Sequence, residues 1–250
     1  MGGIRIDPLV GEVLHVTSDE RSRNWMLDKN AKKVSRDVQI ISVDNIPFYK
    51  DSAIHFPSHI IREGDILIRH PYEHNLYLDP NNAAFEIRFS KYTLISEIAQ
   101  RLGAVRYEIK EAIETVEQRE LSSNGSIDYK MVKSAINIKN QDDLKNTMGI
   151  LIEDEFPKCK SSAKDAIAFA QEYNLWNDSM IRSLIRKCSY QDNPLTHEHL
   201  RFDVTQEANS RFDAAFSLNA LKGILNIDAS INTLLSKRET IMLDIIFTFQ

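Results

Sequence analysis

Alternating apolar and polar residues dominate the first third of the chain and predict short strands. Residues alternate in segment 11–17 (GEVLHVT), and segments 37–44 (DVQIISVD) and 64–70 (GDILIRH) are short runs rich in β-branched residues. Both patterns are typical of strands. Residues 18–36 are highly charged, and we expect a short helix or an ordered loop there. The N-terminal part is therefore predicted to be rich in β-structure.

The segment from residue 85 to residue 109 changes its period twice. Apolar residues alternate over 85–89 and again over 105–109, and between them residues 94–102 follow the helical period. Ser90 is suited to begin such a helix and Gly103 to end it. We predict a strand–helix–strand unit, in which the helix can connect two parallel strands.

Asn124 and Gly125 form the strongest short hairpin signal in the chain. They predict a long β-hairpin over 110–139. The competing interpretation is a charged helix over 109–120, because its apolar residues also fit the helical spacing and glutamate is a good helix former. The sequence leaves both open. A further strand is expected over 148–154 (MGILIED).

The chain becomes helical after residue 160 and then returns to β-structure. Ser162 and Asp165 form a capping box at the start of the first helix. The last segment, 239–249 (ETIMLDIIFTF), alternates strictly, and a strand this apolar should lie inside a sheet because an exposed edge of this kind aggregates. The expected elements between 160 and 232 are helices at 161–174, 177–188 and 208–224 and strands at 200–206 and 227–232.

These elements predict an α+β fold with a mixed, mainly antiparallel sheet. It contains one strand–helix–strand unit, a long β-hairpin and a helical segment before the C-terminal strands. Because the last 50 or so residues return to β-structure, we expect one interwoven α+β unit over 1–250. The alternative is a β-rich lobe over 1–157 followed by a helical lobe over 158–250 that ends in a β-hairpin.

Composition narrows the choice of function. The net charge of −5 opposes binding of the whole chain to a phosphate backbone, and aromatic and basic residues do not cluster into a nucleic-acid platform. No stretch of 18 apolar residues predicts a transmembrane segment, and the N-terminus lacks a secretion-signal pattern, so we expect a cytoplasmic protein. Cys159 and Cys188 lack metal-ligand spacing, although Cys159, which stands between two lysines, would be reactive if exposed.

Two pairs of histidines are candidate metal ligands. His70 and His74 stand four apart, but Pro71 disfavours the single helix that the zincin motif requires. His197 and His199 would share one face of a strand, a spacing that zinc sites use. The four residues form a metal site only if the two segments meet. Otherwise His70 and His74 belong to a turn whose rings bind the backbone, and the other pair marks an exposed strand entry.

Other motifs add little catalytic chemistry. No nucleophile elbow, phosphate-binding loop or dinucleotide motif is present, so no catalytic residue is assigned and we lean away from an enzyme. The carboxylates of 153–155 suggest a nuclease, but they are consecutive and therefore point to opposite faces. Tyr72 and Tyr77 beside the histidines predict a pocket, and the turn at Asn124 and Gly125 predicts an interaction surface.

The absence of catalytic signatures together with the long hairpin favours an interaction or effector protein. We expect it to be soluble and intracellular, to act by binding or self-assembly, to have a protein partner or form a homo-oligomer, and to need no cofactor. The alternative is a hydrolase or nuclease that uses a divalent metal on the histidine pairs or on the 153–155 carboxylates. A third hypothesis is a membrane-acting or pore-forming protein that uses the hairpin, although neither hairpin face has the uninterrupted apolar row that lipid requires.

Overall fold

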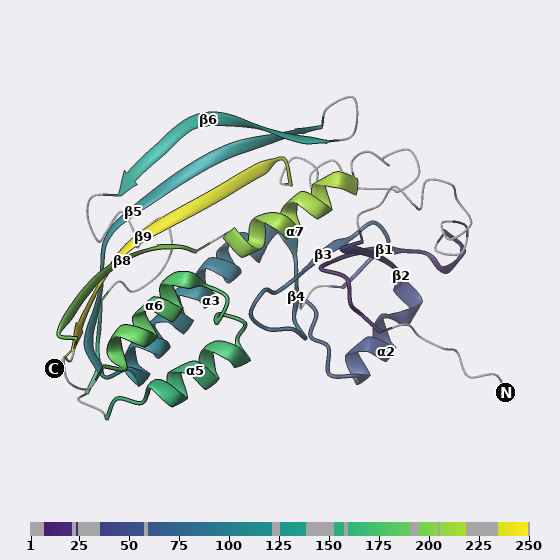
Figure 1. Cartoon of the computed structure of the whole chain (residues 1–250). Helices are drawn as coiled ribbons and strands as arrows, with labels where there is room; N and C mark the ends of the chain where they lie inside the picture. The colour runs from purple at the N-terminus through teal and green to yellow at the C-terminus, as the bar shows by residue number, and fades with distance from the viewer. Residues whose placement is uncertain are drawn as a thin grey trace. The chain divides into compact units, whose positions relative to one another are not determined.

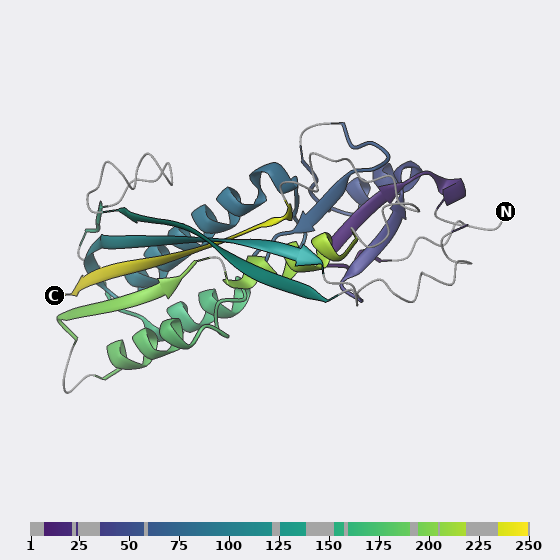
Figure 2. The same ribbon diagram turned by 90° about the horizontal axis from the view of Figure 1, so that it is seen from above.

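The computed structural model has an α+β fold with mainly antiparallel sheets, as the sequence predicts (Figures 1 and 2). The structure describes residues 8–21, 24, 36–57, 60–121, 126–138, 153–157, 160–190, 195–204, 206–218 and 235–249. The chain forms two compact units. Unit 1 comprises Met1–Ala84, Glu117–Val132 and Glu207–Arg238, and unit 2 comprises Phe85–Val116, Lys133–Gln206 and Glu239–Gln250.

Unit 1 contains a four-stranded sheet in the order β2-β1-β3-β4. β1 runs parallel to β2 and antiparallel to β3. The strands predicted in the first 70 residues are thus confirmed. The elements are β1 (Val13–Thr17), β2 (Val38–Ser42), η2 (Val43–Asn45), α2 (Ile46–Asp51), β3 (Ile66–Arg69) and β4 (Tyr77–Leu78).

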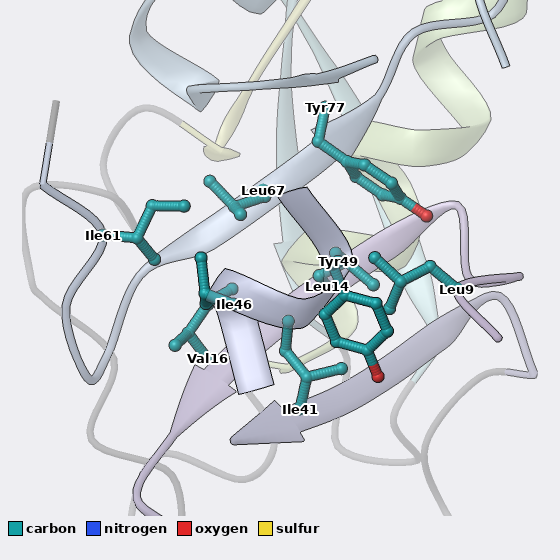
Figure 3. Packing of buried hydrophobic residues seen from close by; sticks show 9 residues of the cluster. All are labelled: Leu9, Leu14, Val16, Ile41, Ile46, Tyr49, Ile61, Leu67 and Tyr77. Carbon is teal, nitrogen blue, oxygen red and sulfur yellow. The ribbon is translucent and has the colours of Figure 1, made fainter. Parts of the chain in front are cut away.

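A hydrophobic core holds α2 against this sheet. Leu14 and Val16, two apart on β1, point to the same face, as the period of a strand requires. They pack with Ile46 and Tyr49 of α2 (Figure 3). The nine buried side chains of this cluster are Leu9, Leu14, Val16, Ile41, Ile46, Tyr49, Ile61, Leu67 and Tyr77.

The second sheet has the strand order β6-β5-β9-β8, and β7 also pairs with β5. In unit 2, helices α3, α5 and α6 lie on one side of β5, β9 and β8 (Figure 1). The elements are α3 (Pro80–Arg101), β5 (Ala104–Leu121), β6 (Ile127–Ile138), β7 (Glu153–Glu155), α5 (Ala163–Glu172), α6 (Ser179–Cys188), β8 (His197–Asp203), α7 (Gln206–Ser217) and β9 (Lys237–Phe249).

The strand predicted at 85–89 is wrong, because these residues belong to helix α3. Ile87 is completely buried, whereas Phe85 and Phe89 are 43% exposed and stack on each other with their ring centroids 6.1 Å apart. Residues four apart share one side of a helix, so the apparent period of two arises from a stacked pair and a buried residue between them. The helix begins at Pro80, a favoured residue for the first turn.

The two arms of the predicted hairpin are strands, which excludes the helix over 109–120. β5 and β6 are neighbours in the sheet. The described end of the strand predicted at 148–154 is β7. The turn at Asn124 and Gly125, the strand at 227–232 and most of the charged segment 18–36 lie outside the described residues.

The C-terminal predictions of unit 2 are also confirmed. The Ser162 hydroxyl accepts a hydrogen bond from the Asp165 backbone N–H at 3.3 Å and caps α5. β9 lies between β5 and β8, so the most apolar strand is inside the sheet. Its Phe247 ring contacts both Tyr107 and Phe202, with centroids 5.6 and 6.2 Å apart.

A buried lysine connects three elements of unit 2. Lys91 of α3 is 1% exposed, and its Nζ donates to the Asp203 carbonyl at the end of β8 at 2.6 Å. The same Nζ lies 3.2 Å from Asp178 Oδ2. Asp178 caps α6 through its other oxygen, which accepts from the Met180 backbone N–H at 2.8 Å.

We expect Lys91→Met to lower the free energy of unfolding by about 3 kcal/mol, because it leaves the mostly buried Asp178 carboxylate without its cation. Urea titration followed by circular dichroism measures this. Adding Asp178→Asn should recover part of the loss, since asparagine also caps helices and carries no charge. The two side chains are not coupled if Asp178→Asn lowers the free energy of unfolding of the Lys91→Met variant by as much as it lowers that of the wild type.

Candidate functional site

The turn after β3 is folded around the ring of His70. His70 is 2% exposed, and its Nδ1 accepts hydrogen bonds from the backbone N–H groups of Tyr72 at 3.3 Å and Glu73 at 3.0 Å. In the sequence, Pro71 separates the acceptor His70 from the donor Tyr72. The His74 side chain is exposed, and its carbonyl accepts from Arg69 Nε at 2.8 Å. The turn that the sequence predicts at His70, with the ring bound to the backbone, is therefore observed.

Burial keeps the His70 imidazole neutral. The pKa of His70 is lowered from 6.5 to about 4, mainly by the loss of solvent and secondly by the nearby positive charge of Arg211. At neutral pH Nδ1 is therefore unprotonated and can accept the two hydrogen bonds from backbone N–H groups.

Helix α7 carries the polar residues that face this turn. The Tyr72 hydroxyl donates to Glu207 Oε2 at 3.3 Å. Arg211, one helical turn after Glu207, donates through Nη1 to the Glu207 carbonyl at 2.6 Å, and its Nη2 lies 2.5 Å from Glu12 Oε2. We call Glu12, His70, Tyr72, Glu207 and Arg211 the α7 cluster. It joins the start of β1, the turn after β3 and α7 within unit 1.

Tyr77 is part of the hydrophobic core of unit 1. It is 1% exposed and stacks with Phe56 at a centroid distance of 5.9 Å. Its hydroxyl donates to the Gly11 carbonyl at 2.9 Å. Burial raises the pKa of Tyr77 to about 12, so the hydroxyl remains protonated as a hydrogen-bond donor. A ligand pocket at Tyr72 and Tyr77 stays a prediction.

His197 and His199 lie on one exposed face of β8, as their spacing predicts. His199 Nε2 is 3.9 Å from Asp244 Oδ2 of β9. Arg201, on the same face, makes two hydrogen bonds to Asp244, at 2.7 and 3.1 Å. These bonds hold the pKa of Asp244 below its usual value. The face is therefore organised around an arginine–carboxylate pair.

The predicted metal ligands fall in both units. His70 and His74 belong to unit 1, and His197 and His199 belong to unit 2. Among the residues that the structure describes, no three histidine, cysteine, aspartate or glutamate side chains group so as to hold a metal ion. Of the nuclease candidates at 153–155, Glu155 is exposed. Cys159 lies outside the described residues.

A buried arginine joins the β5–β6 ribbon to α7. Arg119 of β5 is 2% exposed, and its Nε donates to Asp213 Oδ1 of α7 at 2.5 Å. Tyr129 of β6 donates its hydroxyl to the other oxygen of Asp213 at 2.6 Å. Arg119 Nη1 also donates to the Leu235 carbonyl at 3.0 Å. We call Arg119, Tyr129 and Asp213 the Asp213 junction. One carboxylate thus fixes both strands of the ribbon.

The two edges of the larger sheet differ in their charge. β6, with twelve residues, has one neighbour among the described strands, and so has β8. β8 carries Glu198, which lies 2.5 Å from Lys187, and Arg201, which is paired with Asp244. Charged side chains on an edge strand oppose pairing with another strand. Five of the seven residues of β8 are charged or histidine and none of these five is buried, whereas only three of the twelve residues of β6 are charged.

The fold and these sites define an α+β chain with a long edge strand. Compared with known proteins, the chain matches no family model, no curated protein and no solved structure. None of the helices in the described part of the chain is both long enough and apolar enough to cross a membrane.

Proposed function

We propose that the protein acts through self-assembly, in which the β6 edge of one copy pairs with the β6 edge of a second copy. The observation that supports this proposal most strongly is the order of the described strands in the larger sheet, in which the twelve-residue β6 stands at one end. An edge strand presents backbone N–H and C=O groups that a further strand can bind.

A second copy is the occupant that the geometry favours. Closed homo-oligomers most often have twofold symmetry, and a twofold interface uses the same surface on both copies. An antiparallel pair of identical strands meets this condition. The Asp213 junction also supports the proposal, because it fixes Tyr129 of β6 to α7 and so holds the start of the edge strand in one position.

Proline substitutions at two successive positions of β6 test this proposal. Alternate N–H groups of an edge strand point toward its neighbour and toward solvent. Of Met131→Pro and Val132→Pro, one removes an N–H bonded to β5 and should destabilise the fold. The other removes an outward N–H and should leave the fold intact but prevent assembly.

Native mass spectrometry and thermal unfolding separate the two effects. Met131→Ala and Val132→Ala, which keep both N–H groups, are the matched controls and should assemble normally. The proposal fails if the proline variant that keeps its stability assembles as well as its alanine control.

The other functional hypotheses stay predictions. A hydrolase or nuclease would need a divalent metal on the histidine pairs or on the carboxylates of 153–155. A membrane-acting role would need the β5–β6 ribbon to present an apolar face to lipid. The exposed Asp128 and Lys130 of β6 oppose that arrangement, because charges on a lipid-facing strand are costly.

A further inference from the structure

We infer that the two β6 strands pair antiparallel about a twofold axis at Tyr129, so that Asp128 of each copy lies opposite Lys130 of the other. This inference rests on the proposed function and adds the register of the interface and the two residues that determine it.

The orientation of Tyr129 places the two charged residues on the opposite face of the strand. Its hydroxyl reaches Asp213, so the Tyr129 side chain points toward α7. Successive side chains of a strand point to opposite faces, and Asp128 and Lys130 therefore share the face directed away from α7. Both are exposed, and neither has an ion-pair partner in the part of the chain that the structure describes.

Twofold symmetry restricts the registers that are allowed. The axis between two antiparallel strands of one sheet is perpendicular to the sheet, so it keeps every side chain on its own face. Directly opposed residues also share a face. The axis must therefore lie midway between one residue and the same residue of the second copy. It cannot lie at a peptide bond between two successive residues of a strand.

Charge distinguishes the three possible axes at residues 128, 129 and 130. An axis at Asp128 or at Lys130 would place that residue against its own copy, which is a like-charge contact. An axis at Tyr129 instead forms two opposite-charge contacts, Asp128 with Lys130 in both directions. Opposite charges directly across a strand pair stabilise it and like charges destabilise it. The pairing would extend over 126–132, because the described part of this arm begins at residue 126.

Charge reversal tests this register. Asp128→Lys places two lysines opposite each other in both contacts, and Lys130→Asp does the same with two aspartates. We expect each variant to self-associate about tenfold more weakly than the wild type. An equimolar mixture of the two restores both opposite-charge contacts and should form a heterodimer of near wild-type affinity. The double variant Asp128→Lys/Lys130→Asp should recover as a homodimer.

Sedimentation equilibrium measures these associations, and circular dichroism verifies that every variant is folded. Association of both single variants at wild-type affinity, or a mixture that stays dissociated, would overturn the register. If the wild type assembles and the outward-facing proline blocks assembly while charge reversal has no effect, only the register fails. If the wild type is monomeric at every concentration, the proposed function itself fails.

Discussion

Replacing Arg119 by methionine will lower the free energy of unfolding by about 3 to 5 kcal/mol. The guanidinium is buried, and it is the cation that faces Asp213 Oδ1 at 2.5 Å. Its removal leaves a carboxylate with a side chain only 24% exposed beside a strand and a helix. It also removes the donor that the Leu235 carbonyl uses and the contact of the guanidinium with the Phe212 ring, 5.8 Å from the centroid.

Chemical denaturation of wild type and variant measures this loss directly. Asp213→Asn is the matched control, because it removes the charge and keeps a group that can accept from Tyr129. The double variant Arg119→Met/Asp213→Asn should be more stable than Arg119→Met alone, since no charge then remains buried without its partner. A loss below 1 kcal/mol for Arg119→Met would contradict the role assigned to the Asp213 junction.

Acid should destabilise the protein strongly between pH 6.5 and pH 4, and this loss should begin at a higher pH than the range where most carboxylates titrate. His15 of β1 and His70 are both 2% exposed, and burial lowers the pKa of each from 6.5 to about 4. Above pH 6.5 both residues are neutral in the folded and unfolded chain. Below pH 6.5 the two histidines bind protons in the unfolded chain but not in the folded chain. The free energy of unfolding therefore falls until the pH reaches the pKa of the folded state, near 4.

The expected loss between pH 7 and pH 5 is about 4 kcal/mol for the two histidines together. His70→Asn keeps an acceptor for the Tyr72 and Glu73 N–H groups but cannot titrate, so this variant should lose about half of the pH dependence. Urea titrations at intervals of half a pH unit measure both curves. Equal slopes for wild type and His70→Asn between pH 6.5 and 5 would show that His70 is accessible to protons in the folded state.

The sequence predicts those helices and strands in which the buried face leaves a regular apolar period. Strand β9 was predicted because Leu243, Ile245 and Phe247 all point into the core. The strand proposed at 85–89 failed because a short period of two also arises from two helical residues four apart. Over 109–120 the sequence fits both a helix and a strand, and pairing with β9 on one side and β6 on the other selects the strand.

The same distinction applies to the sites. The turn at His70 was predictable, because Pro71 and the neighbouring residues determine it locally. The partners of this turn were not, since Glu207 lies 135 positions after Tyr72. Asp213 and Arg119 are 94 positions apart and have no common pattern in the sequence. Such pairs cannot be predicted from local sequence, because only the tertiary structure brings two distant polar residues together.

The most direct test of self-assembly through β6 is the mass of the wild-type protein by light scattering over a wide concentration range at 0.15 M salt or thereabouts. The chain mass is 28.7 kDa. We predict twice this mass at high concentration, with dissociation on dilution, and the mass of one chain at every concentration for the stable proline variant of β6. A wild-type protein with the mass of one chain throughout would contradict the proposed function.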